Sequence, residues 1–184
     1  MTFSYKRFLK LPEPTREDFR PNRERILDAL KPLDVSMSLE AMRSLYPMTA
    51  EADYTVTVTL SPGPQGLEVL RVEPGDTTKK LLGLALDIGS TTLEMELVDM
   101  VTGRVLRNVG CVNSQTAFGL NILDRILAVK EKRENLETLR QLVVGDINRL
   151  IGEATEALAD PAEISALIVG GNTTMIHFFL GCDP

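Results

Sequence analysis

The chain has 184 residues, of which 26 are acidic, 20 are basic and 43% are apolar, so its formal net charge is −6. The acidic balance argues against a general affinity for nucleic acid, because binding to phosphates needs clustered Lys and Arg. The apolar runs are far shorter than the roughly 20 residues that cross a bilayer, and the charged N-terminal segment does not resemble a secretory signal. Two cysteines cannot form a disulfide framework. We therefore expect a cytoplasmic protein with reduced thiols and no membrane segment.

Residues 1–78 predict a small α+β module that begins with a mildly basic arm. The first 34 residues contain eight basic and six acidic side chains. Pro12 and Pro14 favour extended chain over helix, so we expect the arm to lie along a surface or to remain free.

Two short helices and a β-hairpin follow the arm. Apolar residues at helical spacing predict helices over residues 21–31 and 38–46, and Ser38 can cap the second. Large apolar residues alternate with Thr over residues 54–60, which predicts a strand with one buried face. Residues 67–72 are the predicted partner of that strand.

Residues 79–184 change to the pattern of an α/β domain. The apolar run at residues 81–88 predicts a strand covered on both faces. Two further strands, at residues 93–100 and 104–112, flank a turn that contains Gly103, so the three strands should be antiparallel neighbours.

The rest of this module is mainly helical. Apolar spacing predicts a helix from about residue 118 to 129, a longer helix over residues 136–158, and a last helix over residues 175–180. Gly145 and Gly152 lower the helix propensity of the long helix, so we expect another element to approach it closely there; its predicted buried face includes Leu158. A strand at residues 164–169 should lie parallel to the first strand of the module.

The densest group of small polar residues lies where a buried strand ends and a hairpin begins. It consists of Asp87, Gly89, Ser90, Thr91 and Thr92. Glycine permits close approach of a ligand, and successive backbone N–H groups with hydroxyls can bind phosphate oxygens. Asp87 could hold Mg²⁺ through water. An Asp-Gly turn with a hydroxyl-bearing surface explains the same residues without a ligand.

A second group follows the later strand and precedes the last helix. It consists of Gly170, Gly171, Asn172, Thr173 and Thr174. If the two strands are neighbours, both groups meet at one sheet edge, where open α/β sheets bind ligands. Capping of the helix by Asn172 or Thr173 is the structural alternative, and capping does not exclude a binding role.

Several segments of the chain resemble the reductive activators of corrinoid proteins. These segments are residues 83–92, 113–119, 124–126 and 168–184, and residues 72–78 with the helices before them add to the resemblance. The activators belong to the superfamily of actin, sugar kinases and heat-shock chaperones. The resemblance implies an α/β fold class, in which a small α+β middle or linker module precedes a partial actin-like (ribonuclease H-like) lobe with mixed sheet order 3-2-1-4.

The resemblance also implies a function. Members of the family use ATP and Mg²⁺ to reduce the Co(II) corrinoid of a partner methyltransferase subunit to Co(I). In this chain, residues 87–92 would be the first phosphate-binding loop, and residues 170–174 would face the nucleotide cleft. The implied partner is the corrinoid protein of a methyltransferase system.

Two features of the family are missing from this sequence. Complete members carry an iron–sulfur domain, whose cluster needs four thiolates, and Cys111 and Cys182 cannot supply them. A second lobe that completes the nucleotide site is also absent. We therefore expect a fragment that is inactive alone and that self-associates through an open sheet edge at residues 164–169.

Two other functions remain open on the sequence. A small-molecule kinase of the same superfamily would share the first loop, but it needs a catalytic Asp and an acceptor pocket that the sequence does not identify. A docking module for a corrinoid protein would use residues 1–78 and no nucleotide. His177, Cys111 and Cys182 are most simply structural residues, with Cys111 in the core and Cys182 near the surface.

Overall fold

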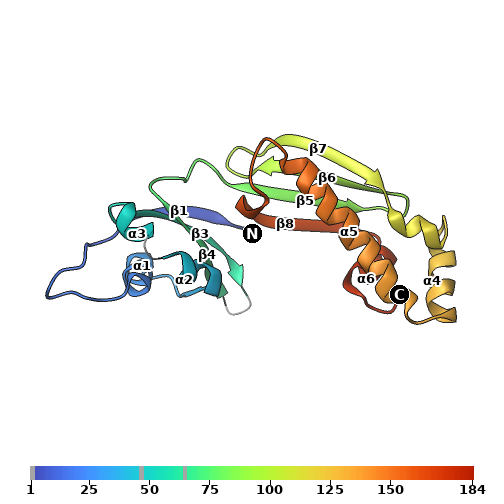
Figure 1. The fold of residues 1–184 in the computed structure, drawn as a ribbon, viewed down its shortest axis with the longest axis horizontal. Coiled ribbons are helices and arrows are strands. Elements are labelled where there is room, and N and C mark those ends of the chain that lie inside the picture. The colour runs from blue at the N-terminus through green and yellow to red at the C-terminus, as the bar shows by residue number, and fades with distance from the viewer. Residues whose placement is uncertain (1–2, 46–47, 64–65) are drawn as a thin grey trace. The chain divides into compact units, whose positions relative to one another are not determined.

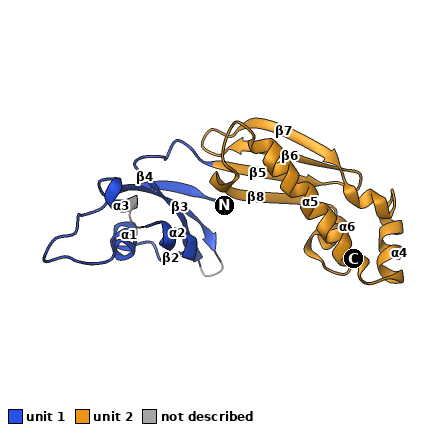
Figure 2. Cartoon of the chain, viewed as in Figure 1, with its two compact units in different colours: residues 1–81 blue, residues 82–184 orange. Residues whose placement is uncertain are grey.

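The structure is a computed structural model that describes residues 3–45, 48–63 and 66–184. The chain divides into two compact units, Met1–Leu81 and Leu82–Pro184 (Figure 2). The expected helix end at residue 46 and the hairpin turn at residues 64–65 lie outside the described residues.

Unit 1 contains a four-stranded sheet in the order β1-β3-β4-β2. Its strands are β1 (Tyr5–Lys10), β2 (Val35–Met37), β3 (Thr55–Gly63) and β4 (Gly66–Pro74), and its helices are α1 (Asn22–Leu30), α2 (Leu39–Ser44) and α3 (Met48–Glu51). Strand β3 is antiparallel to both β1 and β4, whereas β2 is parallel to β4. Ser38 caps α2 as the sequence predicts, because its hydroxyl accepts a hydrogen bond from the N–H of Ala41 at 3.1 Å.

The N-terminal arm is more ordered than its prolines indicate. Residues 5–10 form the edge strand β1, which the sequence analysis missed. The loop after β1 runs along the surface and is fixed from within by Arg25, which is 1% exposed. The Arg25 guanidinium donates to the carbonyl oxygens of Pro12 at 2.9 Å and Asp18 at 2.7 Å, and to the Asp18 carboxylate at 3.0 Å.

The alternating strand β3 is buried on both faces, so the prediction of one buried face was wrong. Its threonines Thr57 and Thr59 are 0% and 1% exposed. The Thr57 hydroxyl donates to the carbonyl oxygen of Gly75 at 2.6 Å, and a largely buried Lys6–Glu73 ion pair at 2.7 Å lies over the same face. Threonine suits this position because its hydroxyl finds a partner while its methyl group packs.

Unit 2 contains the second four-stranded sheet, in the order β7-β6-β5-β8. Its strands are β5 (Leu82–Ile88), β6 (Thr92–Asp99), β7 (Arg104–Val112) and β8 (Ile164–Gly171). Strands β5, β6 and β7 pair antiparallel, and β8 is parallel to β5. In chain order this is the predicted arrangement 3-2-1-4, and the mixed α/β fold class is confirmed.

Helix α5 (Asn135–Thr155) covers one face of this sheet, and the other helices of unit 2 pack beside it (Figure 1). These other helices are η1 (Ser114–Phe118), α4 (Ile122–Glu131) and α6 (Thr173–Leu180), and a short turn, η2 (Pro161–Glu163), precedes β8. The core joins alternate residues of the strands, such as Leu84 and Met95, to Val143 and Leu150 of α5 and Phe178 of α6. Strand β5 was predicted to be covered on both faces. The face opposite the helices is exposed to solvent at the C-terminal end of the strand, where Asp87 lies.

Two expectations for the long helix were wrong. A Cβ atom on Gly145 or Gly152 would meet no atom within 4 Å, so no other element approaches the helix there. Both glycines face solvent. Leu158 was placed on the buried face, but α5 ends at Thr155 and Leu158 is 46% exposed. In the part of the chain that the structure describes, no helix has the length and apolar character needed to cross a bilayer.

Candidate functional site

The two predicted polar groups lie at the same edge of the unit 2 sheet. Because β5 and β8 are parallel neighbours, Asp87 pairs with Gly170 and Ile88 pairs with Gly171. The loops that follow both strands therefore begin side by side. A Cβ atom on Gly170 would lie 3.9 Å from Oδ1 of Asp87, so the exposed carboxylate lies beside the second loop.

The first loop, residues 89–91, is a tight turn that requires glycine at its start. The N–H of Gly89 donates to the carbonyl oxygen of Thr92 at 2.9 Å. A Cβ atom on Gly89 would lie only 2.6 Å from that same oxygen, which is closer than real Cβ contacts come. We refer to residues 89–92 as the polar hairpin.

The carbonyl groups of the polar hairpin accept hydrogen bonds from the protein interior. Asn113, which is 0% exposed, donates its side-chain amide to Gly89 O at 2.9 Å and its backbone N–H to Thr91 O at 2.8 Å. Arg125, also 0% exposed, donates Nη2 to Ser90 O at 2.6 Å. Three consecutive carbonyl oxygens are thus held by buried donors.

This arrangement fixes the direction of the N–H groups. In a trans peptide, the C=O of one residue and the N–H of the next point in opposite directions. Because the carbonyls of Gly89 and Ser90 point towards Asn113 and Arg125, the N–H groups of Ser90 and Thr91 point away from them. Neither N–H donates to another residue in the described ranges. The hairpin therefore presents two free donors beside the hydroxyls of Ser90, Thr91 and Thr92, an arrangement suited to an anion.

The second loop leads into α6. Gly171 allows close packing, since a Cβ atom there would lie 3.0 Å from Ile88 O. Oδ1 of Asn172 accepts a hydrogen bond from the N–H of Met175 at 3.1 Å, so Asn172 is the N-cap of α6. The α6 N-terminus, with its partial positive charge, is therefore at the same sheet edge as the polar hairpin. Thr173 is exposed and Thr174 is partly buried in the first turn.

A buried polar cluster behind the polar hairpin was not recognised as part of the site. Gln115 is 0% exposed; its N–H donates to Asn113 Oδ1 at 2.9 Å, and its side-chain amide donates to Leu139 O of α5 at 2.8 Å. The Asp146 carboxylate accepts from both the N–H and the hydroxyl of Ser114 at 2.8 Å. The sequence resemblance included residues 113–119 and 124–126 but gave them no role. The sequence offered one signal for this cluster: Arg125 is a charged residue at a position of α4 that faces the protein interior.

The other reactive side chains do not form a site. Burial raises the pKa of the Cys111 thiol, with nearby Asp146 adding to the effect, so the half-buried thiol stays protonated. Cys182 is exposed, and His177 Nδ1 lies 2.9 Å from the carbonyl oxygen of Asp183. Among the described residues, no group of three or more His, Cys, Asp or Glu side chains is placed to hold a metal ion.

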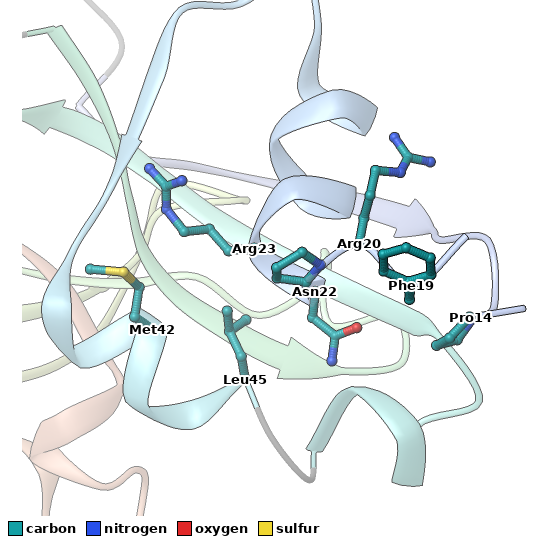
Figure 3. Close-up of a pocket in the computed structure, with 8 residues that line it drawn as sticks. Pro14, Phe19, Arg20, Asn22, Arg23, Met42 and Leu45 are labelled. Carbon is teal, nitrogen blue, oxygen red and sulfur yellow. The ribbon is translucent and has the colours of Figure 1, made fainter. Parts of the chain in front are cut away.

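Unit 1 carries a separate pocket with a volume of about 520 Å³ (Figure 3). Its lining residues come from the N-terminal loop and from α1 and α2; they are Pro14, Phe19, Arg20, Pro21, Asn22, Arg23, Met42 and Leu45. Phe19 is 85% exposed, so most of its ring is accessible to a partner. The lining includes two arginines, of which Arg20 is ion-paired with Asp18 and Asp28, so Arg23 supplies the positive charge at this largely apolar pocket.

Residues 82–184 match the family described as the RACo middle region. The chain belongs to the RACo family. Residues 3–79 match the family described as the RACo linker region, so the family matches cover both units. The family resemblance inferred from the sequence is confirmed.

The chain is also similar to a curated protein and to a solved structure. It is 28% identical over 161 residues to the corrinoid activation enzyme RamQ of Eubacterium limosum, a match that covers 79% of this chain and 27% of RamQ. It is 34% identical to a structure described as a reductive activator for corrinoid, iron-sulfur protein, with a TM-score of 0.83. That match covers 99% of this chain and 30% of the other chain. The chain thus spans less than a third of the length of either relative.

Proposed function

We propose that this chain supplies the first phosphate-binding loop of an ATP-dependent activator that reduces the Co(II) corrinoid of a methyltransferase partner to Co(I). The names of the two relatives support corrinoid activation. The supporting observation in the structure is the pair of free N–H groups on the polar hairpin, directed away from the buried donors at the edge where β5 and β8 end.

The residues of the polar hairpin suit a magnesium nucleotide. The N–H groups and hydroxyls of Ser90 and Thr91 would bind phosphate oxygens, and Gly89 leaves the backbone accessible. Asp87 is exposed at the mouth of the same strand and would hold Mg²⁺ through water. Residues 170–174, at the neighbouring strand end, would line the same cleft. ATP would supply the free energy for the uphill electron transfer to cobalt.

The electron itself must come from elsewhere. Reduction of Co(II) to Co(I) consumes one electron, and an iron–sulfur cluster in the complete activator would provide it. This chain does not fit such a cluster, because a cluster needs four thiolates and the chain has only the half-buried Cys111 in β7 and the exposed Cys182. We propose that the cluster, and the lobe that closes over the nucleotide, belong to other parts of a longer cytoplasmic protein.

The sheet edge formed by β8 supports self-association when the second lobe is absent. Strand β8 pairs with β5 on one side and is the last strand of the sheet. Leu167 and Ile168 on β8 are 42% and 47% exposed. An apolar edge strand can pair with another chain. Sedimentation velocity should show dimers or larger species of the 184-residue chain, and a strictly monomeric sample would contradict this part of the proposal.

Calorimetry with Mg-ATP tests the nucleotide proposal. We expect the 184-residue chain to bind with a dissociation constant on the order of millimolar, since half of the site is present. Addition of the C-terminal lobe should restore tight binding. Asp87→Asn should weaken that binding, whereas Asp34→Asn, the same change on an exposed residue of unit 1, should not. Micromolar affinity of the isolated chain, or equal effects of the two variants, would contradict the proposal.

The pocket in unit 1 supports a second candidate function, the docking of the corrinoid protein. Phe19 offers an exposed aromatic anchor, and Arg23 would attract an acidic partner surface, whereas Arg20 is already ion-paired with Asp18 and Asp28. Phe19→Ala should weaken capture of a purified corrinoid protein at least tenfold if Phe19 is such an anchor (a loss of about 1.4 kcal/mol or more). Leu120→Ala, which removes an exposed apolar side chain of unit 2, serves as the control. Undiminished capture by the Phe19 variant would exclude docking at this pocket.

A further inference from the structure

Arg125 is the largest buried group of the site that has no assigned role. It lies on α4 with an exposed fraction of 0%, and its guanidinium is behind the polar hairpin. Nη2 donates to Ser90 O at 2.6 Å and Nε donates to Gly119 O at 3.0 Å. A third contact, from Nη1 to Oε1 of Gln115, is longer at 3.5 Å.

The positive charge of Arg125 is not neutralised by a carboxylate. Its recorded partners in the described chain are two carbonyl oxygens, one side-chain amide oxygen and the sulfur of Met175. Burial lowers the pKa of this guanidinium from its ordinary value, and the neighbouring Asp124 offsets only part of that effect. Buried charges in proteins are normally paired, because an isolated one is costly. An anion bound on the outer side of the hairpin would complete the pair.

The peptide group between Ser90 and Thr91 connects the guanidinium to that outer side. Its carbonyl oxygen accepts the 2.6 Å bond from Arg125, and its N–H belongs to Thr91 and points the opposite way. A cation bound to the carbonyl polarises the peptide and makes its N–H a stronger donor, since linked hydrogen bonds reinforce one another. Arg125 can therefore act on a ligand that it does not touch.

The surroundings of Arg125 hold the guanidinium in place. Gly119, whose carbonyl accepts from Nε, has a φ of +141°, and a Cβ atom there would collide with Cβ of Asp124. Gln115 is tied to α5 through Leu139 O. The guanidinium is therefore held between the carbonyl of Gly119 and the buried side-chain amide of Gln115, and it has little freedom to move.

We infer that Arg125 is a positioning residue for a phosphate-bearing anion at the polar hairpin, acting through the Ser90–Thr91 peptide and through its own unpaired charge. This inference rests on the proposed phosphate site. It predicts that the charge of residue 125 matters for anion affinity, beyond its contribution to the fold.

Titration of the ¹⁵N-labelled chain with pyrophosphate at constant ionic strength tests this inference. Arg125→Lys keeps the charge, and Arg125→Gln keeps a donor without the charge. Arg25→Gln is the matched control, because Arg25 is an equally buried arginine that holds a loop of unit 1. The amide shifts of Ser90 and Thr91 report binding, and hydrogen exchange of the core amides reports the fold.

We expect Arg125→Gln to raise the pyrophosphate dissociation constant by about tenfold, as loss of a charge-assisted interaction should. Arg125→Lys should stay within about threefold of the parent chain, and Arg25→Gln should not alter it. Equal losses in the Lys and Gln variants would show a purely structural role, and unchanged affinity in the Gln variant would show no role; either result overturns the inference. If the parent chain shows no shifts at Ser90 and Thr91, the proposed phosphate site itself is wrong.

Discussion

Substitution of Gly89 by Ala should destabilise unit 2 through a single close contact. The added Cβ would lie 2.6 Å from Thr92 O, whereas a normal separation is well above 3 Å, and the obstacle is backbone that cannot rotate away. The hairpin must open, which stretches the Gly89–Thr92 hydrogen bond of 2.9 Å and the bond from Asn113 to Gly89 O. Overpacking of this kind costs about 2 kcal/mol.

That loss is large enough to measure by thermal unfolding. For a unit of this size, about 2 kcal/mol corresponds to a fall of roughly 8–16 °C in Tm. Differential scanning calorimetry of the whole chain would follow the transition of unit 2 relative to that of unit 1.

Gly170→Ala is the matched control on the neighbouring strand. Its Cβ would make ordinary contacts, 3.8 Å from Leu86 O and 3.9 Å from Asp87 Oδ1, so its Tm should change by less than about 3 °C. A Gly89→Ala chain that melts within that same margin of the parent would refute the contact as the reason for glycine at this position.

Three further predictions concern stability and thiol reactivity. Gly145→Ala should stabilise the chain by about 0.5–1 kcal/mol in urea unfolding, because it removes an exposed helical glycine with no neighbour within 4 Å; any loss of stability would contradict this. Lys6→Met should destabilise unit 1 by about 3 kcal/mol, since it leaves the largely buried Glu73 unpaired, and Lys6→Met with Glu73→Gln should recover part of that loss in the same assay. Iodoacetamide at pH 8 should alkylate the exposed Cys182 before Cys111, whose pKa is raised by burial, and mass spectrometry should show Cys111 gaining reactivity as the pH rises; equal rates at pH 8 would count against it.

Helices and strands whose apolar residues recur at a regular spacing were predictable from the sequence. The apolar runs of β5 and β8, the turn at Gly103 and the spacing in α5 fix one sheet and one long helix, and the right-handed crossover makes β8 parallel to β5. The same reasoning failed for β1, because residues 5–10 mix charged and apolar side chains without a clean alternation. An edge strand takes its stability from the neighbour that it pairs with, here β3.

Three glycines of unit 2 also show what the residue type alone leaves undecided. Gly89 was assigned to the close approach of a ligand, whereas the structure gives a different reason for glycine there, because a Cβ atom would collide with Thr92 O of its own turn. Gly145 and Gly152 were given a similar explanation, yet nothing lies near them. Residue type alone cannot separate these cases, because the distance to a distant backbone oxygen depends on how the chain folds back.

The sequence by itself determined the family, the order of strands and helices in unit 2, and the residue types at the two strand ends. It did so because local spacing and turn chemistry act over a few residues. Only the tertiary structure decided that Asn113 and Arg125 lie behind the polar hairpin and hold its carbonyl oxygens, and that Gln115 contacts Arg125 there. These contacts join residues 10 to 35 positions apart, and such hydrogen bonds exist only after packing of the helices on the sheet has removed water from around them.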